Sequence, residues 1–76
     1  MDIQLEKLSR VFTSAFEEEV KLTLDTKKED LEAWDSINHL NLIVELESEF
    51  DVTFDSHEIE GLNSIKNLIQ LLKSKI

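Results

Sequence analysis

Three residues in the middle of the chain could do chemistry together: Asp35, Ser36 and His39. A carboxylate, a hydroxyl and an imidazole are the groups of a hydrolytic triad. Ser36 and His39 are three positions apart, so on one helix their side chains would be neighbours. A triad also needs an oxyanion hole aimed at a substrate, and one short helix in a chain of 76 residues offers no substrate cleft. We therefore expect no catalytic residue, and we expect His39 and His57 to lie on the surface.

Carboxylates form the second group of reactive side chains. Asp51 with Asp55, or Glu45 with Glu49, could hold a divalent cation weakly. The glycine-centred ligand pattern of an EF-hand is absent, so we expect no dedicated metal site. The chain also has no cysteine, which excludes thiolate metal sites and any thioester on a side chain. Thiol chemistry would have to come from a cofactor.

Ser36 has a further chemistry available because the sequence places it at a helix start. Asp35 and Ser36 are both strong N-cap residues. The unpaired backbone N–H groups and the helix dipole at an N-terminus stabilise an anion. A phosphodiester on Ser36 Oγ would lie in that field. A serine here is also an ordinary N-cap, and these two residues alone do not distinguish the two roles.

The helix that begins at Asp35–Ser36 and runs to about Phe50 has more apolar residues than one core-facing stripe needs. At about 100° per residue they form two groups roughly 140° apart. The inner group is Leu42, Ile43, Leu46 and Phe50, which would face Leu68 and Leu72, and the outer group is Ile37, Leu40 and Val44. A domain this small can hardly cover both, so we expect the outer group to be partly exposed and to mark an interaction site. The alternative is that the preceding loop covers it.

The rest of the pattern predicts an all-α fold. The chain has no proline and one glycine, too few turn residues for a mostly β protein. Apolar spacing predicts a first helix over about residues 2–17 and a last helix opened by Asn63 or Ser64.

The segments between these helices carry cap and turn signals. Residues 20–34 predict a long ordered loop, in which a capping box of Thr26 and Glu29 would start a short turn of helix. Ser56 is expected to cap a short third helix that ends at Gly61.

The charge is strongly negative and unevenly distributed. The formal net charge is −9, and the stretch from Glu29 to Glu60 contains acids but no Lys or Arg. Nucleic acid and anionic membranes are poor partners for such a chain. The sequence begins without a signal-peptide pattern and has no apolar run near the roughly 20 residues of a membrane span, so we expect a cytoplasmic protein. The acidic stretch is either a solvated surface or a docking face for basic partners.

The run from Leu31 to Phe50 resembles the acyl carrier protein family. The hallmark of that family is Asp-Ser-Leu at the start of the second helix, followed by apolar positions and an acidic-Phe ending; Asp35, Ser36 and Ile37 match its opening. Length, acidity and helix order agree along nearly the whole chain. The resemblance implies a single carrier domain over residues 1–76, folded as a bundle of three long helices plus one short helix.

The resemblance also implies a function. A separate phosphopantetheinyl transferase would join the 4'-phosphopantetheine arm of coenzyme A to Ser36, and acyl groups would be held as thioesters on the arm. The chain would be a monomeric carrier, not an enzyme, in fatty acid, polyketide or related specialised biosynthesis. Its partners would be acyl-transferring and acyl-modifying synthase enzymes with basic docking patches. The implied site residues are Ser36 and Asp35 for the cofactor, and Ile37, Leu40, Val44, Glu45, Glu47 and Glu49 for docking.

Three positions depart from the family pattern. Trp34 stands where Gly or Ala is frequent, and Asn38 and Asn41 stand where acids are common. A specialised carrier is therefore credible, and a D-alanyl or peptidyl carrier is an alternative. A second alternative is an unmodified acidic adaptor that binds a partner helix along the outer apolar group.

Overall fold

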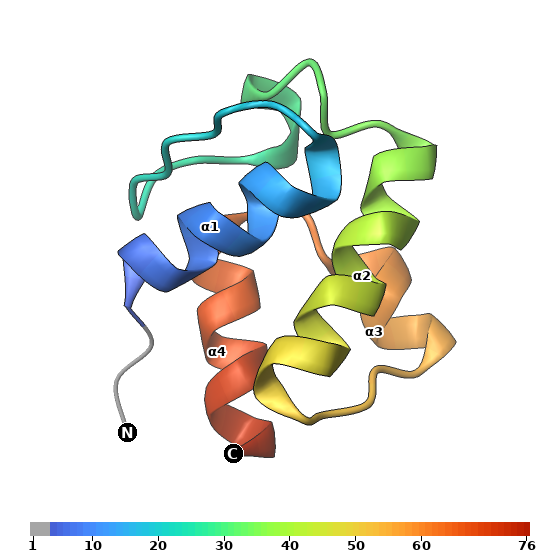
Figure 1. Cartoon of the computed structure of the whole chain (residues 1–76). Helices are drawn as coiled ribbons and strands as arrows, with labels where there is room; N and C mark the ends of the chain where they lie inside the picture. The colour runs from blue at the N-terminus through green and yellow to red at the C-terminus, as the bar shows by residue number, and fades with distance from the viewer. Residues whose placement is uncertain (1–3) are drawn as a thin grey trace.

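The computed structural model describes residues 4–76, so the first residues of the predicted first helix lie outside the described part (Figure 1). The elements are α1 (Leu5–Phe16), a 3-10 turn η1 (Lys28–Asp30), α2 (Ser36–Phe50), α3 (Ser56–Gly61) and α4 (Ile65–Lys75). Three helices are long and one is short, and residues 4–76 contain no strand. The prediction of an all-α bundle of this composition is confirmed.

The core forms where the apolar faces of the long helices meet. α1 buries residues at helical spacing, among them Phe12, which is fully buried. The Phe12 ring meets the Trp34 ring edge-on at 5.1 Å and the Phe16 ring at 5.4 Å. Aromatic pairs in this geometry contribute about 0.5–1.5 kcal/mol each beyond their buried area. Trp34 therefore anchors the α1–α2 loop in the core, just before α2 begins.

Polar side chains set the helix starts. The Asp35 carboxylate accepts a hydrogen bond from the backbone N–H of Asn38 at 2.8 Å, so Asp35 is the N-cap of α2 and Ser36 is its first residue. Ser64 caps α4, which confirms Ser64 rather than Asn63 as the start of the last helix.

The predicted Ser56 cap of α3 is wrong. Asp55 caps this helix instead, because its carboxylate accepts from the Glu58 N–H at 2.8 Å while the Glu58 carboxylate accepts from the Asp55 N–H at 3.0 Å. This reciprocal capping box satisfies two backbone donors at once. The predicted end of the helix at Gly61 is confirmed.

The α1–α2 connection is an ordered loop that crosses one end of the bundle (Figure 1). The capping box predicted for Thr26 and Glu29 is wrong: the Asp30 carboxylate accepts from the Lys27 N–H at 3.0 Å, and the Thr26 hydroxyl accepts from the Thr23 N–H at 2.9 Å. The helical turn consequently starts at Lys28.

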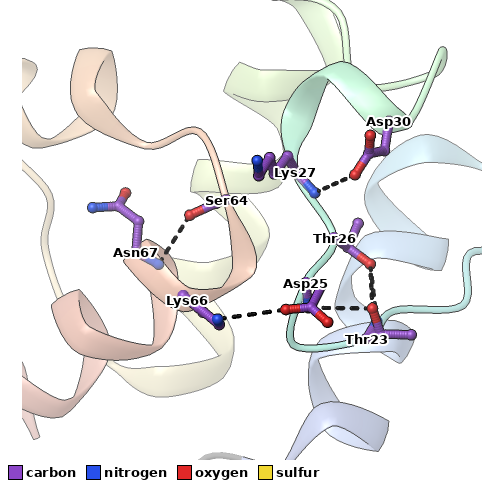
Figure 2. Close-up of polar contacts among 8 residues, drawn as sticks. All are labelled: Thr23, Asp25, Thr26, Lys27, Asp30, Ser64, Lys66 and Asn67. Carbon is purple, nitrogen blue, oxygen red and sulfur yellow. Dashed lines mark hydrogen bonds and ion pairs between the residues drawn. The ribbon is translucent and has the colours of Figure 1, made fainter.

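Backbone hydrogen bonds fasten this loop to the start of α4. The Lys28 N–H donates to the Asn63 carbonyl at 2.8 Å, and the Ile65 N–H donates to the Thr26 carbonyl at 2.9 Å. Figure 2 shows the two segments side by side, with an exposed ion pair between Asp25 and Lys66. The loop that leads into α2 is thus tied to the helix that follows α3.

Two helix ends adopt the left-handed backbone conformation without glycine. Glu17 follows α1 with φ 57°, and Asp51 follows α2 with φ 53°. Gly61 has no positive φ, so the one glycine of the chain does not occupy either of these turns.

Candidate functional site

Ser36 is exposed at the first position of α2. The capping role belongs to Asp35, so the Ser36 hydroxyl is not needed to start the helix. The backbone N–H groups of the first turn and the positive end of the helix dipole point toward this end of α2. A phosphodiester on Ser36 Oγ would lie in a stabilising field, so the position fits a phosphate-linked group.

The outer apolar group of α2 is exposed, as predicted. Ile37 is 73% exposed, Leu40 59% and Val44 65%, and together they form what we call the outer stripe. The opposite side of α2 is buried in the core through Leu42, Ile43 and Leu46. The alternative that the loop covers the outer stripe is therefore wrong, and α2 presents an apolar surface next to Ser36.

The three predicted acidic contacts of α2 differ in their surroundings. Glu49 is exposed and Glu45 is half-buried. Glu47 is also half-buried, and its carboxylate accepts from the backbone N–H of Phe54 at 2.9 Å. This bond holds the loop after α2, so Glu47 has a structural task that the sequence did not indicate.

His39 is buried, so its predicted surface position is wrong, whereas His57 is exposed as predicted. The Trp34 indole N–H donates to His39 Nδ1 at 2.8 Å, and His39 Nε2 lies 2.8 Å from the carbonyl oxygen of Ile59. Both ring nitrogens are engaged away from Ser36, and the Asp35 carboxylate serves as a cap. A triad of these three residues does not form.

A surface groove of about 720 Å³ lies beside the start of α2. It is bordered by η1 on one side and the start of α4 on the other, with Leu31, Trp34, Asp35 and Ser64 among its lining residues. Asp35 lines the groove, and Ser36 is the next residue in the chain. A group attached to Ser36 would therefore start at the edge of the groove.

The acidic stretch from Glu29 to Glu60 contains eleven acids, and Glu58 is the one that forms an ion pair among the described residues. Lys75 of α4 lies 2.8 Å from the Glu58 carboxylate. The hydrogen bond from Lys75, with that from the Asp55 N–H, lowers the pKa of Glu58. Within the part of the chain that the structure describes, the other ten acids of this stretch form no ion pair with a neighbouring cation.

Two further types of site are absent from residues 4–76. No helix in this range is both long and apolar enough to cross a bilayer. No three His, Asp or Glu side chains in the same range come together as a possible metal site.

An exposed serine at the start of a helix that also presents an exposed apolar stripe and acidic side chains is the arrangement expected of a phosphopantetheine-dependent carrier, and comparison with known proteins agrees. Residues 6–72 match the family model described as a phosphopantetheine attachment site. The chain is 32% identical over 77 residues to an acyl carrier protein of Petrotoga mobilis, across 99% of this chain and 89% of the relative. The solution NMR structure of holo acyl carrier protein from Geobacter metallireducens superimposes with a TM-score of 0.81 at 35% identity, across 93% of this chain and 83% of that one.

The chain therefore belongs to the acyl carrier protein family and contains a phosphopantetheine attachment domain. Its cofactor is 4'-phosphopantetheine. Its relatives are acyl carrier proteins.

Proposed function

We propose that Ser36 is the attachment residue and that the arm it carries holds acyl intermediates of fatty acid, polyketide or a related specialised biosynthesis. The observation that carries the proposal is the exposure of Ser36 at the N-terminus of α2, with Asp35 relieving it of the capping role. The chain acts as one carrier domain over residues 1–76, monomeric and in the cytoplasm, and it is not itself an enzyme.

The attachment is a group transfer from coenzyme A. Ser36 Oγ attacks the phosphorus that bears the pantetheine arm and forms an O–P bond. The pyrophosphate bond of coenzyme A breaks, adenosine 3',5'-bisphosphate leaves, and the serine proton passes to a base of the transferase or to water. The first-turn N–H groups of α2 favour the phosphodiester that results.

Docking of the transferase and the synthase enzymes uses the outer stripe together with nearby acids. Ile37, Leu40 and Val44 give a small apolar contact, and the acids Asp35, Glu45, Glu47 and Glu49 attract basic patches on the partners. Charge raises the association rate and orients the complex, while a contact of this size lets the carrier leave each enzyme quickly.

A specialised pathway is favoured by the asparagines of α2. Asn38 donates to the Ala33 carbonyl at 2.8 Å, and Asn41 donates to the Asn38 side chain at 3.2 Å. These amides build a local hydrogen-bonded turn and lower the negative charge of the docking face relative to the usual family pattern. Partners of this carrier therefore need fewer basic contacts there, and an aminoacyl cargo fits this proposal as a variant.

The test is intact mass after incubation with coenzyme A, magnesium and a broad-specificity transferase. The natural chain should gain one phosphopantetheine, and Ser36→Ala should gain none. Ser36 is not the cap, so this variant should change the free energy of unfolding by less than about 0.5 kcal/mol, whereas Asp35→Ala should cost about 1 kcal/mol.

Ser48→Ala, on the exposed side of the same helix, is the matched control and should be modified normally. An arm that maps to Ser48, Ser56 or Ser64 would show that the assignment is wrong. A natural chain that gains no mass would favour the unmodified adaptor.

A further inference from the structure

A buried polar cluster joins the segment ahead of Ser36 to α3, and neither the attachment chemistry nor the outer stripe uses it. Trp34 is 3% exposed and His39 8% exposed, with ring centroids 6.1 Å apart in a stacked arrangement. His39 accepts from the Trp34 indole on one nitrogen and contacts the Ile59 carbonyl of α3 with the other, both at 2.8 Å. One imidazole thus touches the loop that leads into α2 and the short helix α3.

The two partners fix the protonation state of this ring. An indole N–H can only donate, so His39 Nδ1 must be the acceptor and carries no proton. A carbonyl oxygen can only accept, so Nε2 carries the proton and donates it to Ile59. The neutral imidazole with its proton on Nε2 is the form that satisfies both bonds. A second proton on Nδ1 would put two donors against each other in a buried place.

Within residues 4–76, no charged side chain is hydrogen-bonded to the His39 ring. The positive charge of a second proton would therefore have no bonded counter-charge. Before α2, the Asp35 carboxylate is bonded to the Asn38 N–H and Glu32 is exposed. On α3, Glu58 is held by Lys75, and His57 and Glu60 are exposed. From α1, the aromatic rings of Phe12 and Phe16 pack against Trp34.

We propose that His39 is a positioning residue for Ser36: as the neutral imidazole it ties Trp34 to α3, and its protonation releases that tie. Trp34 lies two residues before Ser36 and lines the groove beside the start of α2. The tie therefore sets both the direction from which the chain enters α2 and one wall of the groove next to the attachment residue. The inference rests on the proposed role of Ser36.

The single tryptophan of the chain gives a direct readout. In an NMR pH series of the full chain, the Trp34 indole N–H signal should move in step with the His39 ring signals, because the indole donates to His39 Nδ1. At neutral pH the ¹⁵N shifts of His39 should report the Nε2–H tautomer. An Nδ1–H tautomer, or an indole signal that stays fixed while His39 titrates, would overturn the proposal.

Variants of His39 and His57 then test whether the hydrogen bonds of His39 affect the modification of Ser36. His39→Gln keeps one donor and one acceptor but cannot titrate, and His57→Gln is the matched control on the surface. The rate of Ser36 modification in the natural chain, divided by the rate in His39→Gln at the same pH, cancels the pH response of the transferase. This ratio should fall roughly fivefold between the pH at which NMR shows His39 neutral and the pH at which NMR shows it protonated, the equivalent of about one hydrogen bond. The same ratio taken with His57→Gln should stay constant.

A second variant keeps the test decisive if His39→Gln does not fold. Trp34→Phe retains a ring in the core and removes the N–H donor, so it should abolish the additional pH dependence of modification. Should Trp34→Phe or His39→Gln keep the pH profile of the natural chain, His39 has no positioning role. Absence of modification in the natural chain at every pH would instead refute the attachment at Ser36. The NMR experiment would then still test whether His39 ties Trp34 to α3.

Discussion

Replacing Val44 with glutamate tests docking and folding separately. Val44 is 65% exposed, whereas Leu46, two residues further along the helix, is fully buried. A charge at position 44 stays in water in the free carrier, so the free energy of unfolding should change by less than about 0.5 kcal/mol. The same charge at position 46 would lie in the core and should prevent stable folding.

The expected loss in docking follows from the exposed fraction. Full burial of a valine side chain stabilises by about 1.5–3 kcal/mol. About two thirds of Val44 remains to be buried by a partner, so its removal should cost the complex about 1–2 kcal/mol, or a factor of roughly 5–30. We therefore expect Val44→Glu to lower kcat/KM of the transferase for the carrier by that factor, mainly through KM.

The assay is transferase kinetics at low and high salt, with urea unfolding of each variant. Thr53→Glu, which adds the same charge at an exposed position outside the outer stripe, is the control and should keep nearly natural kcat/KM. Two results would refute the reasoning. If Val44→Glu is folded and modified at the natural rate, the outer stripe is not a docking surface; if it unfolds, the stripe contributes to the core.

Three further predictions concern charge and cargo. Added salt or magnesium should raise Tm, because ten carboxylates between residues 29 and 60 lack an ion pair in the described chain and repel one another; a Tm that ignores salt would argue against charge strain. The lowered pKa of Glu58, caused first by Lys75, means that its contribution to stability is present above the usual value of 4.5 and is lost as pH falls through the lowered pKa. Glu58→Gln should therefore unfold with a weaker acid dependence than the natural chain in a pH series of urea melts, and an unchanged dependence would contradict this. Acylation should shift the methyl NMR signals of Leu42 and Leu46 if cargo enters the core, and identical signals with and without an acyl group would exclude shelter there.

Much of the fold was predictable because helical periodicity and caps are local signals. The extent of α2, the end of α3 and the exposure of the outer stripe all followed from spacing and from the small size of the domain. The caps were harder to predict, since adjacent residues such as Asp55 and Ser56 both have side chains that can cap a helix. Which of them reaches the N3 amide depends on backbone geometry that spacing does not encode.

The burial of His39 could not be read from periodicity. Its position on α2 lies beside the inner group, but a lone histidine is common at surfaces and its partners come from two other segments. Trp34 was the available signal, because a buried indole N–H needs an acceptor and His39 is five residues away. The same holds for Glu47, whose partner Phe54 lies beyond the helix end.

The left-handed turns at Glu17 and Asp51 show that this sequence is not at its maximum of stability. A side chain other than glycine in this conformation costs roughly 1–2 kcal/mol, and an acid there also faces the negative end of a helix dipole. Neither residue lies on the outer stripe, so substituting glycine at these two turns should raise the free energy of unfolding without changing the docking surface. A carrier stabilised in this way could then tolerate destabilising substitutions on α2 that direct it to other enzymes.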